Sequence, residues 1–333
     1  MAGLPRIALI LTGGTIDSLG RDRLDLAWYH EAGQRLGPGE LLGMVPEAGR
    51  GAVVTEIPFR RLSSHALQPP DLLDLGRVVV RLLEHDEADG VVIAHGTNTL
   101  EETAYFLHLT VRTTRPIVLV GAMRPASALS PDGPLNLLRA IQVAATPEAH
   151  GRGVLVVLND TIYSAREVTK TATYRVQTFA GRDLGPLGYA DADGRVVFYH
   201  APARRHTAQS EFDVRYLDTL PRVDIVLSYL GADGALVDAA VAAGAQGLVS
   251  AGTGAGRPTP AEEAALLRAS TAGVAVVQSS RVGAGRVVRS PALRQRGWIA
   301  ADNLVPWKAR LLLQLGLTRT RDPEALQRLF DEY

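Results

Sequence analysis

The stretch IALILTGGTID, residues 7–17, decides how the chain begins to fold. Its apolar residues run without interruption into two glycines that stand between two threonines, Thr12 and Thr15. A continuous apolar run of this length that ends in glycine is typical of a buried strand in a parallel sheet. The glycines let the chain turn sharply and let another group approach the backbone closely. We therefore expect a strand followed by a turn that presents hydroxyl groups.

The same pattern of an apolar run followed by a stretch that can form a helix recurs along the chain. Further runs of this kind lie at 90–97, 116–122, 153–160, 224–230, 247–254 and 274–280. Strands that alternate with helices indicate a parallel sheet with helices on both faces. Ligands on such sheets bind at the carboxyl ends of the strands, so the polar residues just after each run are the candidates for function.

A break in this pattern divides the chain into two predicted domains. Residues 201–221 are polar, flanked by proline and without periodicity, and we interpret them as a linker. Residues 1–200 predict a larger N-terminal α/β catalytic domain with a β-hairpin that turns at Asp193-Gly194. Residues 222–333 predict a smaller C-terminal α/β domain. The expected fold class is α/β with two domains, each built on a mainly parallel β-sheet flanked by helices.

Composition narrows the classes of protein that the chain can be. It has no cysteine among 333 residues, which excludes disulfides, thiolate metal sites and cysteine nucleophiles. Lys plus Arg and Asp plus Glu number 35 each, so no overall basic charge favours nucleic acid as a partner. The first residues do not read as a signal peptide, and no apolar run approaches the ~20 residues of a membrane helix. We expect a cytoplasmic protein without nucleic-acid or membrane contact.

Hydroxyl groups and one lysine follow the predicted strands of the first domain. The strand ends carry Thr12 and Thr15, then HGTNT at 95–99, GAMRP at 121–125 and, in the next region, Lys170. Threonine becomes a nucleophile when a base takes its proton, and a lysine can be that base if burial lowers its pKa from ~10.4. Backbone N–H groups at a glycine turn can stabilise an oxyanion. These parts predict acyl transfer by a threonine nucleophile, with no metal or other cofactor.

Six sequence blocks together are similar to the bacterial-type L-asparaginase/glutaminase family. They are TGGTI at 12–16, HGTNTLEETAYFL at 95–107, GAMRP at 121–125, LNDTIYSAREVTKT at 158–171, GPLGY at 185–189 and KARLLLQLGLT at 308–318. Their order and spacing match that family from residue 7 to the C-terminus. The resemblance implies a cytoplasmic threonine amidohydrolase that hydrolyses asparagine to aspartate and ammonia. It also implies a homodimer or homotetramer whose sites are completed across the dimer.

The resemblance implies a catalytic role for four residues. Thr15 is expected to be the nucleophile. Tyr29 is expected to orient and activate Thr15 when its loop closes over the substrate. That loop belongs to the long segment 17–46, which follows the first strand and has glycines and charges but no clear periodicity. Thr97 and Lys170 are expected to form a second hydroxyl–base pair.

The substrate-binding residues that the resemblance implies depart from the family pattern at one end of the substrate. Ser64 is expected to bind the α-carboxylate, and the backbone near Ala122 is expected to contact the side-chain amide. Toward the α-ammonium, the family has aspartate where this chain has Asn98, and glutamine where this chain has His65. Across the dimer, the family has glutamate where Ser290 stands here, in a segment without any acidic residue.

These departures predict weak recognition of the α-ammonium while the amide chemistry stays intact. Charge-assisted hydrogen bonds are about twice as strong as neutral ones, so the loss of two carboxylates weakens the binding of an ammonium group. Asparagine then binds poorly, or the preferred substrate has a blocked or missing amino group. Alternatively, another acidic residue replaces the missing ones, and Asp17, Glu56 and Asp132 are the nearest in sequence.

Other functions stay open as alternatives. A glutaminase or a broader ω-amidase would differ mainly in the size of the substrate pocket. A protein that binds or senses an amide without hydrolysing it is favoured by Asn98 but disfavoured by the survival of Thr15, Thr97 and Lys170. Binding of NAD is a weaker reading, because LTGGTIDSLG lacks the G-x-G-x-x-G spacing.

Several polar residues within the blocks have a structural interpretation. Thr12 is expected to be structural. Glu101 is expected to favour the start of a helix through the helix dipole. Asp132 is expected to stabilise a turn, and His95 to pack in the core or to hydrogen-bond to the backbone.

Overall fold

The computed structural model describes residues 3–333, and contacts between Cα atoms divide the chain into two compact units. The first unit ends at Tyr216 and the second spans Leu217–Tyr333. Each unit has a mainly parallel sheet with flanking helices, which confirms the predicted fold class. Within the described residues, none of the helices is long and apolar enough to cross a membrane.

The large sheet of the first unit has eight strands among the described residues, in the order β10-β9-β6-β5-β4-β3-β1-β2. Its parallel part comprises β1 (Arg6–Leu11), β2 (Val53–Ile57), β3 (Gly90–Ala94), β4 (Ile117–Val120) and β5 (Val154–Leu158). The apolar run that opens the sequence is β1, and it lies between β2 and β3. The carboxyl ends of β1 and β3 are therefore neighbours at one edge of the sheet.

Short antiparallel strands complete the first unit. The parallel strands are followed in the sheet by β6 (Thr161–Ser164), β9 (Gly188–Ala190) and β10 (Val196–Phe198). Strands β9 and β10 pair antiparallel across the turn that contains Asp193-Gly194, which confirms the predicted hairpin. A separate antiparallel pair, β7 (Thr169–Lys170) and β8 (Phe179–Ala180), carries Lys170.

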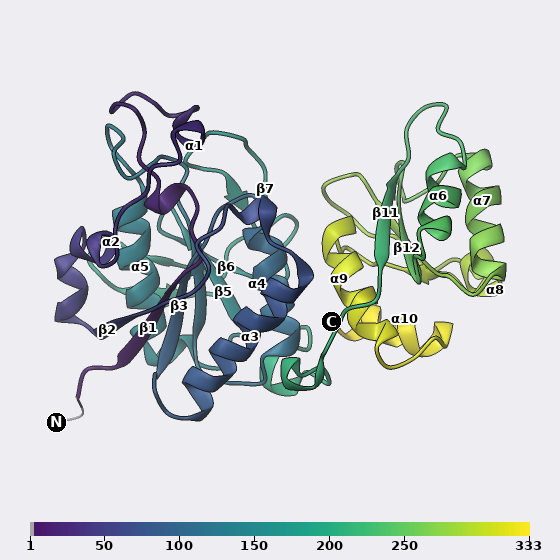
Figure 1. The fold of residues 1–333 in the computed structure, drawn as a ribbon. Coiled ribbons are helices and arrows are strands. Elements are labelled where there is room, and N and C mark those ends of the chain that lie inside the picture. The colour runs from purple at the N-terminus through teal and green to yellow at the C-terminus, as the bar shows by residue number, and fades with distance from the viewer. Residues whose placement is uncertain (1–2) are drawn as a thin grey trace. The chain divides into compact units, whose positions relative to one another are not determined.

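Helices cover both faces of the large sheet because its central strands are apolar on both faces. Helix α5 (Gly133–Ala145) lies on one side, and α3 (Pro69–Glu84) and α4 (Leu100–Thr110) lie on the other (Figure 1). Every residue of β3 and β4 is buried. The rigid sheet therefore fixes the positions of the loops at its carboxyl edge.

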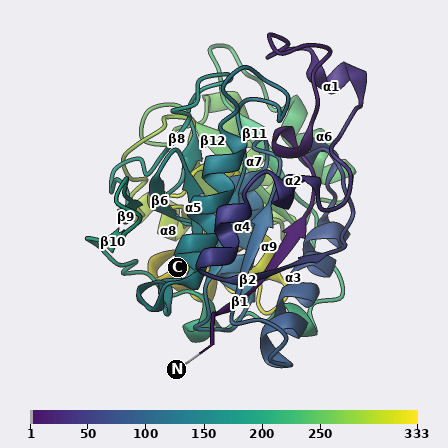
Figure 2. The same cartoon turned by 90° about the vertical axis from the view of Figure 1, so that its left-hand side faces the viewer.

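The long segment after β1 forms short helical turns rather than one long helix. They are η1 (Thr15–Asp17), α1 (Tyr29–Ala32), α2 (Glu40–Gly43) and η2 (Pro46–Arg50). Figure 2 shows the loop with α1 beyond the carboxyl end of β1. Leu24 and Trp28 in this loop are exposed, so its tip buries little apolar surface. Hydrogen bonds and ion pairs at its ends therefore contribute most to its position.

Residues 201–216 of the predicted linker fold with the first unit. They contain the turns η5 (Thr207–Gln209) and η6 (Val214–Tyr216). Phe212 and Val214 are buried, and Ser210 Oγ donates to the Leu109 carbonyl at 2.5 Å. The turns η3 (Ser64–Ala66) and η4 (Pro147–Ala149) lie earlier in the same unit.

The second unit has a parallel sheet of four strands among the described residues, in the order β11-β12-β13-β14. These strands are β11 (Val223–Leu227), β12 (Gly247–Gly252), β13 (Ala275–Ser280) and β14 (Ile299–Ala300). Its helices are α6 (Ala235–Ala242), α7 (Pro260–Thr271), α8 (Pro291–Gln295), α9 (Pro306–Leu317) and α10 (Pro323–Glu332). Asp322 Oδ2 accepts from Ala325 N at 2.8 Å and begins α10 as an N-cap.

Candidate active site

The turn after β1 brings two sequence blocks into backbone contact. Gly13 and Gly14 have φ values of +92° and +126°, a region that favours glycine. A Cβ on Gly14 would lie 2.4 Å from the Cα of Gly96, so no side chain fits between the two turns. Because β1 and β3 are paired, Thr15 and Thr97 follow adjacent strand ends.

Thr15 forms a hydroxyl pair with the loop residue Tyr29. The distance between Thr15 Oγ1 and Tyr29 Oη is 2.8 Å. Burial raises the pKa of Tyr29 above its usual 10, although the hydrogen bond with Thr15 opposes this shift. The phenol is therefore protonated at neutral pH. The structure brings together the two residues that the sequence analysis paired on the basis of the resemblance.

Thr97 forms a second pair with Lys170. Lys170 Nζ donates to Thr97 Oγ1 at 2.9 Å and to Asn98 Oδ1 at 3.3 Å. Burial lowers the pKa of Lys170 below its usual 10.5, and the charge of Glu101 opposes this shift. A lysine with a lowered pKa has a larger neutral fraction at a given pH, which a base requires.

Glu101 is more closely involved with this pair than the sequence indicated. Its side chain is buried in the first turn of α4, and its Oε1 accepts from the backbone N–H of Lys170 at 3.0 Å. Glu101 therefore ties the short strand β7 to α4 and positions the lysine beside Thr97. A helix-dipole argument from sequence placed it at the helix start but could not show this contact.

Ser64 is buried beside the two glycine turns. Its Oγ has no hydrogen-bond partner among the described residues, and a Cβ on Gly96 would lie 2.7 Å from it. Thr99 Oγ1 donates to the Ser64 carbonyl at 2.8 Å and fixes the backbone there. A buried hydroxyl without a protein partner is rare, and a bound ligand can satisfy it. His65, next to it, is exposed.

The backbone around Ala122 is held rigidly at the end of β4. Asp132 accepts hydrogen bonds from the backbone N–H groups of Met123 and Arg124, at 2.9 and 2.8 Å. A Cβ on Gly121 would lie 2.9 Å from Thr97 Cγ2, which places this strand end against Thr97. Asp132 stabilises the turn, as predicted. Ala122 is fully buried.

The acidic residues proposed as replacements near the α-ammonium have other partners. The Asp17 carboxylate contacts Arg35 and Arg61, and the Asp132 carboxylate is occupied by the backbone N–H groups described above. Glu56, the penultimate residue of β2, accepts through Oε2 from Gly39 N at 2.9 Å. Asp17 and Asp132 thus already have charged or hydrogen-bonding partners.

Ser290, predicted to approach the substrate across a dimer, lies in the second unit. There it is the N-cap of α8, and its Oγ accepts from Leu293 N at 3.3 Å. The side chain is exposed. Its contact with substrate stays a prediction.

His95 and Thr12 have structural environments. His95 is fully buried, with Nδ1 2.8 Å from the Gly96 carbonyl and Nε2 3.0 Å from Thr103 Oγ1. Burial lowers the pKa of His95 to about 4, so its ring is neutral at physiological pH. Thr12 Oγ1 donates to the Ala94 carbonyl at 3.1 Å. Both side chains connect the ends of β1 and β3 to their surroundings.

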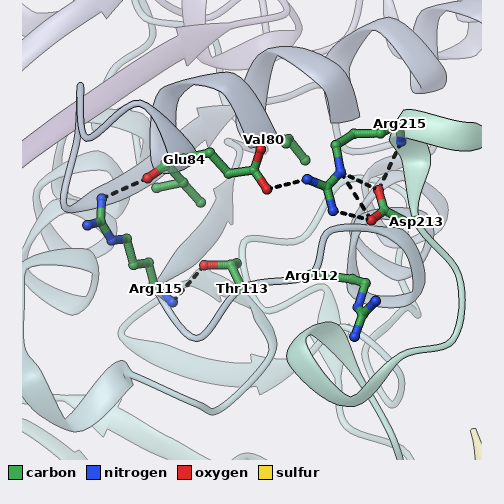
Figure 3. A pocket seen from close by; sticks show the side chains of 8 residues that line it. Val80, Glu84, Arg112, Thr113, Arg115, Asp213 and Arg215 are labelled. Carbon is green, nitrogen blue, oxygen red and sulfur yellow. Dashed lines mark hydrogen bonds and ion pairs between the residues drawn. The ribbon is translucent and has the colours of Figure 1, made fainter.

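A small cavity elsewhere in the first unit, of about 100 Å³, has a different character (Figure 3). It lies between the end of α3, the segment before β4 and η6. Arg215 pairs there with Asp213 and Glu84, and Arg115 pairs with Asp86. Arg112 also lines this cavity, which shares no residue with the two threonine pairs. Among the described residues, no three His, Asp or Glu side chains gather into a metal site.

Two family models together match most of the chain. The model described as Asparaginase, N-terminal matches residues 6–204, and the model described as Glutaminase/Asparaginase C-terminal domain matches residues 222–330. The chain belongs to the asparaginase family. The two threonine pairs lie within the part matched by the N-terminal model.

Asparaginase relatives extend over the full chain. L-asparaginase 2 of Bacillus subtilis (strain 168) is 43% identical over 99% of this chain and 87% of its own. The glutaminase-asparaginase of Pseudomonas fluorescens biotype A is 40% identical over 99% of this chain and 91% of its own. The crystal structure of a probable cytoplasmic L-asparaginase from Campylobacter jejuni superposes with a TM-score of 0.91, at 39% identity, and covers 99% of this chain and 100% of that one.

The sequence analysis did not predict the ion pairs of Asp17, and it did not use the small number of lysines as a signal for Lys170. The ion pairs of Asp17 with Arg35 and Arg61 join segments far apart in the sequence, so spacing does not reveal them. The signal is the scarcity of lysine. Lys170 and Lys308 are the only lysines of the chain. Every other residue in its count of Lys plus Arg is an arginine. A position that keeps lysine in such a chain is a candidate for chemistry that arginine cannot perform.

Proposed function

We propose that this asparaginase-family protein hydrolyses the side-chain amide of L-asparagine to aspartate and ammonia, with Thr15 as the nucleophile. The observation that carries the proposal is the pair of hydroxyl contacts at adjacent strand ends. Thr15 lies 2.8 Å from the Tyr29 hydroxyl, and Thr97 lies 2.9 Å from the Lys170 amine. The L-asparaginases of the family support the substrate class.

The reaction proceeds in two acyl-transfer steps. In the first, Thr15 Oγ forms a bond to the amide carbon, the C–N bond breaks, and the hydroxyl proton passes to the leaving nitrogen, which departs as ammonia. Tyr29 orients the Thr15 hydroxyl and relays this proton. In the second step, water attacks the ester carbon, the bond to Thr15 Oγ breaks, one proton of the water passes to Thr15 Oγ, and aspartate leaves.

The second threonine pair and the strand end near Ala122 complete this scheme. In the second step Thr97 takes a proton from the attacking water while its own hydroxyl proton passes to neutral Lys170, and the pair then gives one proton to Thr15 Oγ, which restores both residues. The backbone near Ala122 contacts the side-chain amide, and backbone N–H groups at the glycine turn after β1 stabilise the negative charge on its oxygen in the transition state. The unsatisfied Ser64 Oγ binds the α-carboxylate of the substrate.

The α-ammonium end of the substrate is bound weakly. Asn98 Oδ1 accepts from Lys170 Nζ at 3.3 Å and carries no charge, and His65 is exposed. Asp17 and Asp132, the candidate substitutes, are occupied by other groups. An amide with a blocked or missing amino group is therefore the second candidate substrate, in the manner of an ω-amidase, because it needs no carboxylate at this end.

Assembly and location follow the same family expectations. We infer a homodimer or homotetramer in which a partner protomer completes each site, with Ser290 as the contributed residue. A cytoplasmic location is supported by the likeness to the probable cytoplasmic L-asparaginase from Campylobacter jejuni.

Release of ammonia from a panel of amides tests this proposal. The panel contains L-asparagine, D-asparagine, L-glutamine, N-acetyl-asparagine and succinamic acid, with Thr15→Ala as the control. Turnover of L-asparagine supports the primary function, and a high KM with ordinary kcat supports weak ammonium binding. Faster turnover of succinamic acid or N-acetyl-asparagine favours the ω-amidase alternative. Tight binding without ammonia release from any member overturns the hydrolytic function in favour of a sensor.

A further inference from the structure

Three charged side chains behind the first glycine turn form a cluster that we call the loop anchor: Asp17, Arg35 and Arg61. Asp17 Oδ1 accepts from Arg35 Nη1 at 2.9 Å. Asp17 Oδ2 accepts from Arg61 Nη2 at 2.6 Å and from Arg61 Nε at 3.1 Å. The Asp17 side chain is 2% exposed, whereas those of Arg35 and Arg61 are 25% and 28% exposed. A buried carboxylate thus holds two arginines from different segments.

The loop anchor joins both ends of the loop 18–35. Asp17 stands directly before the loop, and Arg35 is its last residue. Backbone contacts strengthen this closure, since Leu36 N donates to the Asp17 carbonyl at 2.8 Å. Arg61 Nη2 also donates to the Leu36 carbonyl, at 2.7 Å. Tyr29 lies within the loop that these contacts close.

The same anchor touches the segments that carry the other candidate site residues. A Cβ on Gly13 would lie 2.7 Å from Arg35 Nη1, so the arginine packs directly on the turn that presents Thr15. Arg61 belongs to the segment that continues to Ser64, and Leu62 N donates to the Thr12 carbonyl at 2.9 Å. One carboxylate therefore fixes three segments relative to one another.

The tip of this loop buries little apolar surface, although Leu129 N donates to the Arg23 carbonyl at 2.7 Å and Arg21 pairs with Glu31. Trp28 and Leu24 are 60% and 74% exposed, so the tip gains little from apolar burial. The first part of the loop does contact the segment after β4, where Ser127 Oγ accepts from Gly20 N at 2.7 Å. Tyr29 itself touches the site through its hydroxyl. Segments with few buried contacts open first, so the ion pairs at the base of the loop decide how often the tip is in the closed position.

We propose that Asp17 is a positioning residue which, through Arg35 and Arg61, holds loop 18–35 where Tyr29 reaches Thr15. The inference rests on the proposed function of Tyr29 and Thr15 and extends it to a residue outside the reacting groups. Asparagine at position 17 would keep the size of the side chain but leave two arginines facing each other without a counter-charge. The closed loop would then lose charge-assisted hydrogen bonds that the open loop does not make.

The test compares Asp17→Asn with Asp213→Asn. Asp213 is a matched control because it is also a buried carboxylate, 7% exposed, held by the guanidinium of Arg215. It lies in the same unit beside η6, outside the threonine pairs. We expect kcat/KM for L-asparagine to fall by roughly tenfold to a hundredfold in Asp17→Asn, as expected for loss of a hydrogen bond between charged groups. Asp213→Asn should stay within about twofold of the wild type, because its lost contact lies outside the site.

A double-mutant cycle with Tyr29→Phe separates positioning from a general loss of structure. If Asp17 acts through Tyr29, adding Asp17→Asn to Tyr29→Phe costs little further activity. Arg35→Lys keeps a positive charge and should retain more activity than Asp17→Asn. Full additivity in the cycle would overturn the proposal, as would equal losses in Asp17→Asn and Asp213→Asn.

Trypsin provides a readout that does not depend on catalysis. Arg21 and Arg23 are exposed residues within the loop, and a cleavage there requires the loop to leave its closed position. We expect Asp17→Asn to be cut at these sites about tenfold faster than the wild type, with Asp213→Asn unchanged. Equal cutting rates in all three proteins would overturn the loop anchor. If the wild type released no ammonia while the cutting rates differed as expected, the proposed function would fail but the anchor would stand.

Discussion

Replacement of Lys170 tests whether this residue acts as a base in the reaction. Lys170→Met keeps an unbranched side chain but removes the amine that donates to Thr97 at 2.9 Å and to Asn98 at 3.3 Å. Loss of a positioned general base reduces rates by roughly 10²–10⁴-fold, which corresponds to about 3–5 kcal/mol of transition-state free energy. Because the variant also removes a partly buried cation, we expect the folded protein to be at least as stable as the wild type.

Lys170→Arg distinguishes a base from a fixed positive charge. An arginine stays protonated throughout the accessible pH range and cannot accept a proton. We therefore expect it to be as inactive as Lys170→Met, although it keeps the charge. The assay is kcat/KM for ammonia release as a function of pH. In the wild type, activity should rise with pH as Lys170 loses its proton, along a limb that lies below the usual lysine pKa of 10.5 because burial lowers it.

Chemical labelling can show whether the rise of activity with pH comes from Lys170. Since the chain has lysine only at 170 and 308, an amine-reactive reagent followed by peptide mapping reads the protonation of Lys170 with little interference. The labelling rate and kcat/KM should rise along the same pH limb. Activity of Lys170→Arg within about tenfold of the wild type would refute the reasoning, since the lysine would then act as a cation and not as a base.

Three further predictions concern Asn98, His95 and Gly14. Asn98→Asp places a carboxylate 3.3 Å from Lys170 Nζ, so the rise of kcat/KM with pH should move to higher pH. The KM for L-asparagine should fall by about tenfold, because the carboxylate forms a charge-assisted bond to the α-ammonium. Steady-state kinetics checks both, and an unchanged KM would contradict weak ammonium binding. Burial lowers the pKa of His95 from 6.5 to about 4, so the free energy of unfolding should fall by about 3 kcal/mol as pH drops from 6.5 to 4. Chemical denaturation should show this dependence of stability on pH in the wild type and a weaker dependence in His95→Gln. Gly14→Ala forces a methyl group to within 2.4 Å of Gly96 Cα at a φ of +126°, so the variant should lose activity and melt at a lower temperature. Wild-type activity and melting temperature in this variant would contradict the close approach of the two turns.

The pattern of the sequence predicted the parts of the fold that depend on local order. The apolar runs became β1, β3, β4 and β5, because a strand buried on both faces must be apolar throughout. The glycine turn at Gly13-Gly14 was readable because its conformation excludes other residues.

The sequence could not reveal contacts that depend on three-dimensional folding. Asp17 is four residues from Gly13 but meets Arg61 from a distant segment, and its type alone made it equally suitable as an ammonium ligand. Glu101 looked like an ordinary residue of a first helical turn until the structure placed it beside the backbone of Lys170. For Tyr29, the resemblance suggested the pairing, while the 2.8 Å contact depends on how a poorly packed loop folds back.

The most direct test of Thr15 as nucleophile is ammonia release from L-asparagine by Thr15→Val compared with Thr12→Val. Both substitutions exchange a hydroxyl for a methyl group in the same turn, but Thr12 Oγ1 donates to the Ala94 carbonyl while Thr15 Oγ1 faces Tyr29. The account predicts that Thr15→Val loses at least about 10³-fold in kcat while keeping its fold, and that Thr12→Val remains active. If Thr15→Val released ammonia at a rate within about tenfold of the wild type, another group would be the nucleophile, and the account would be contradicted.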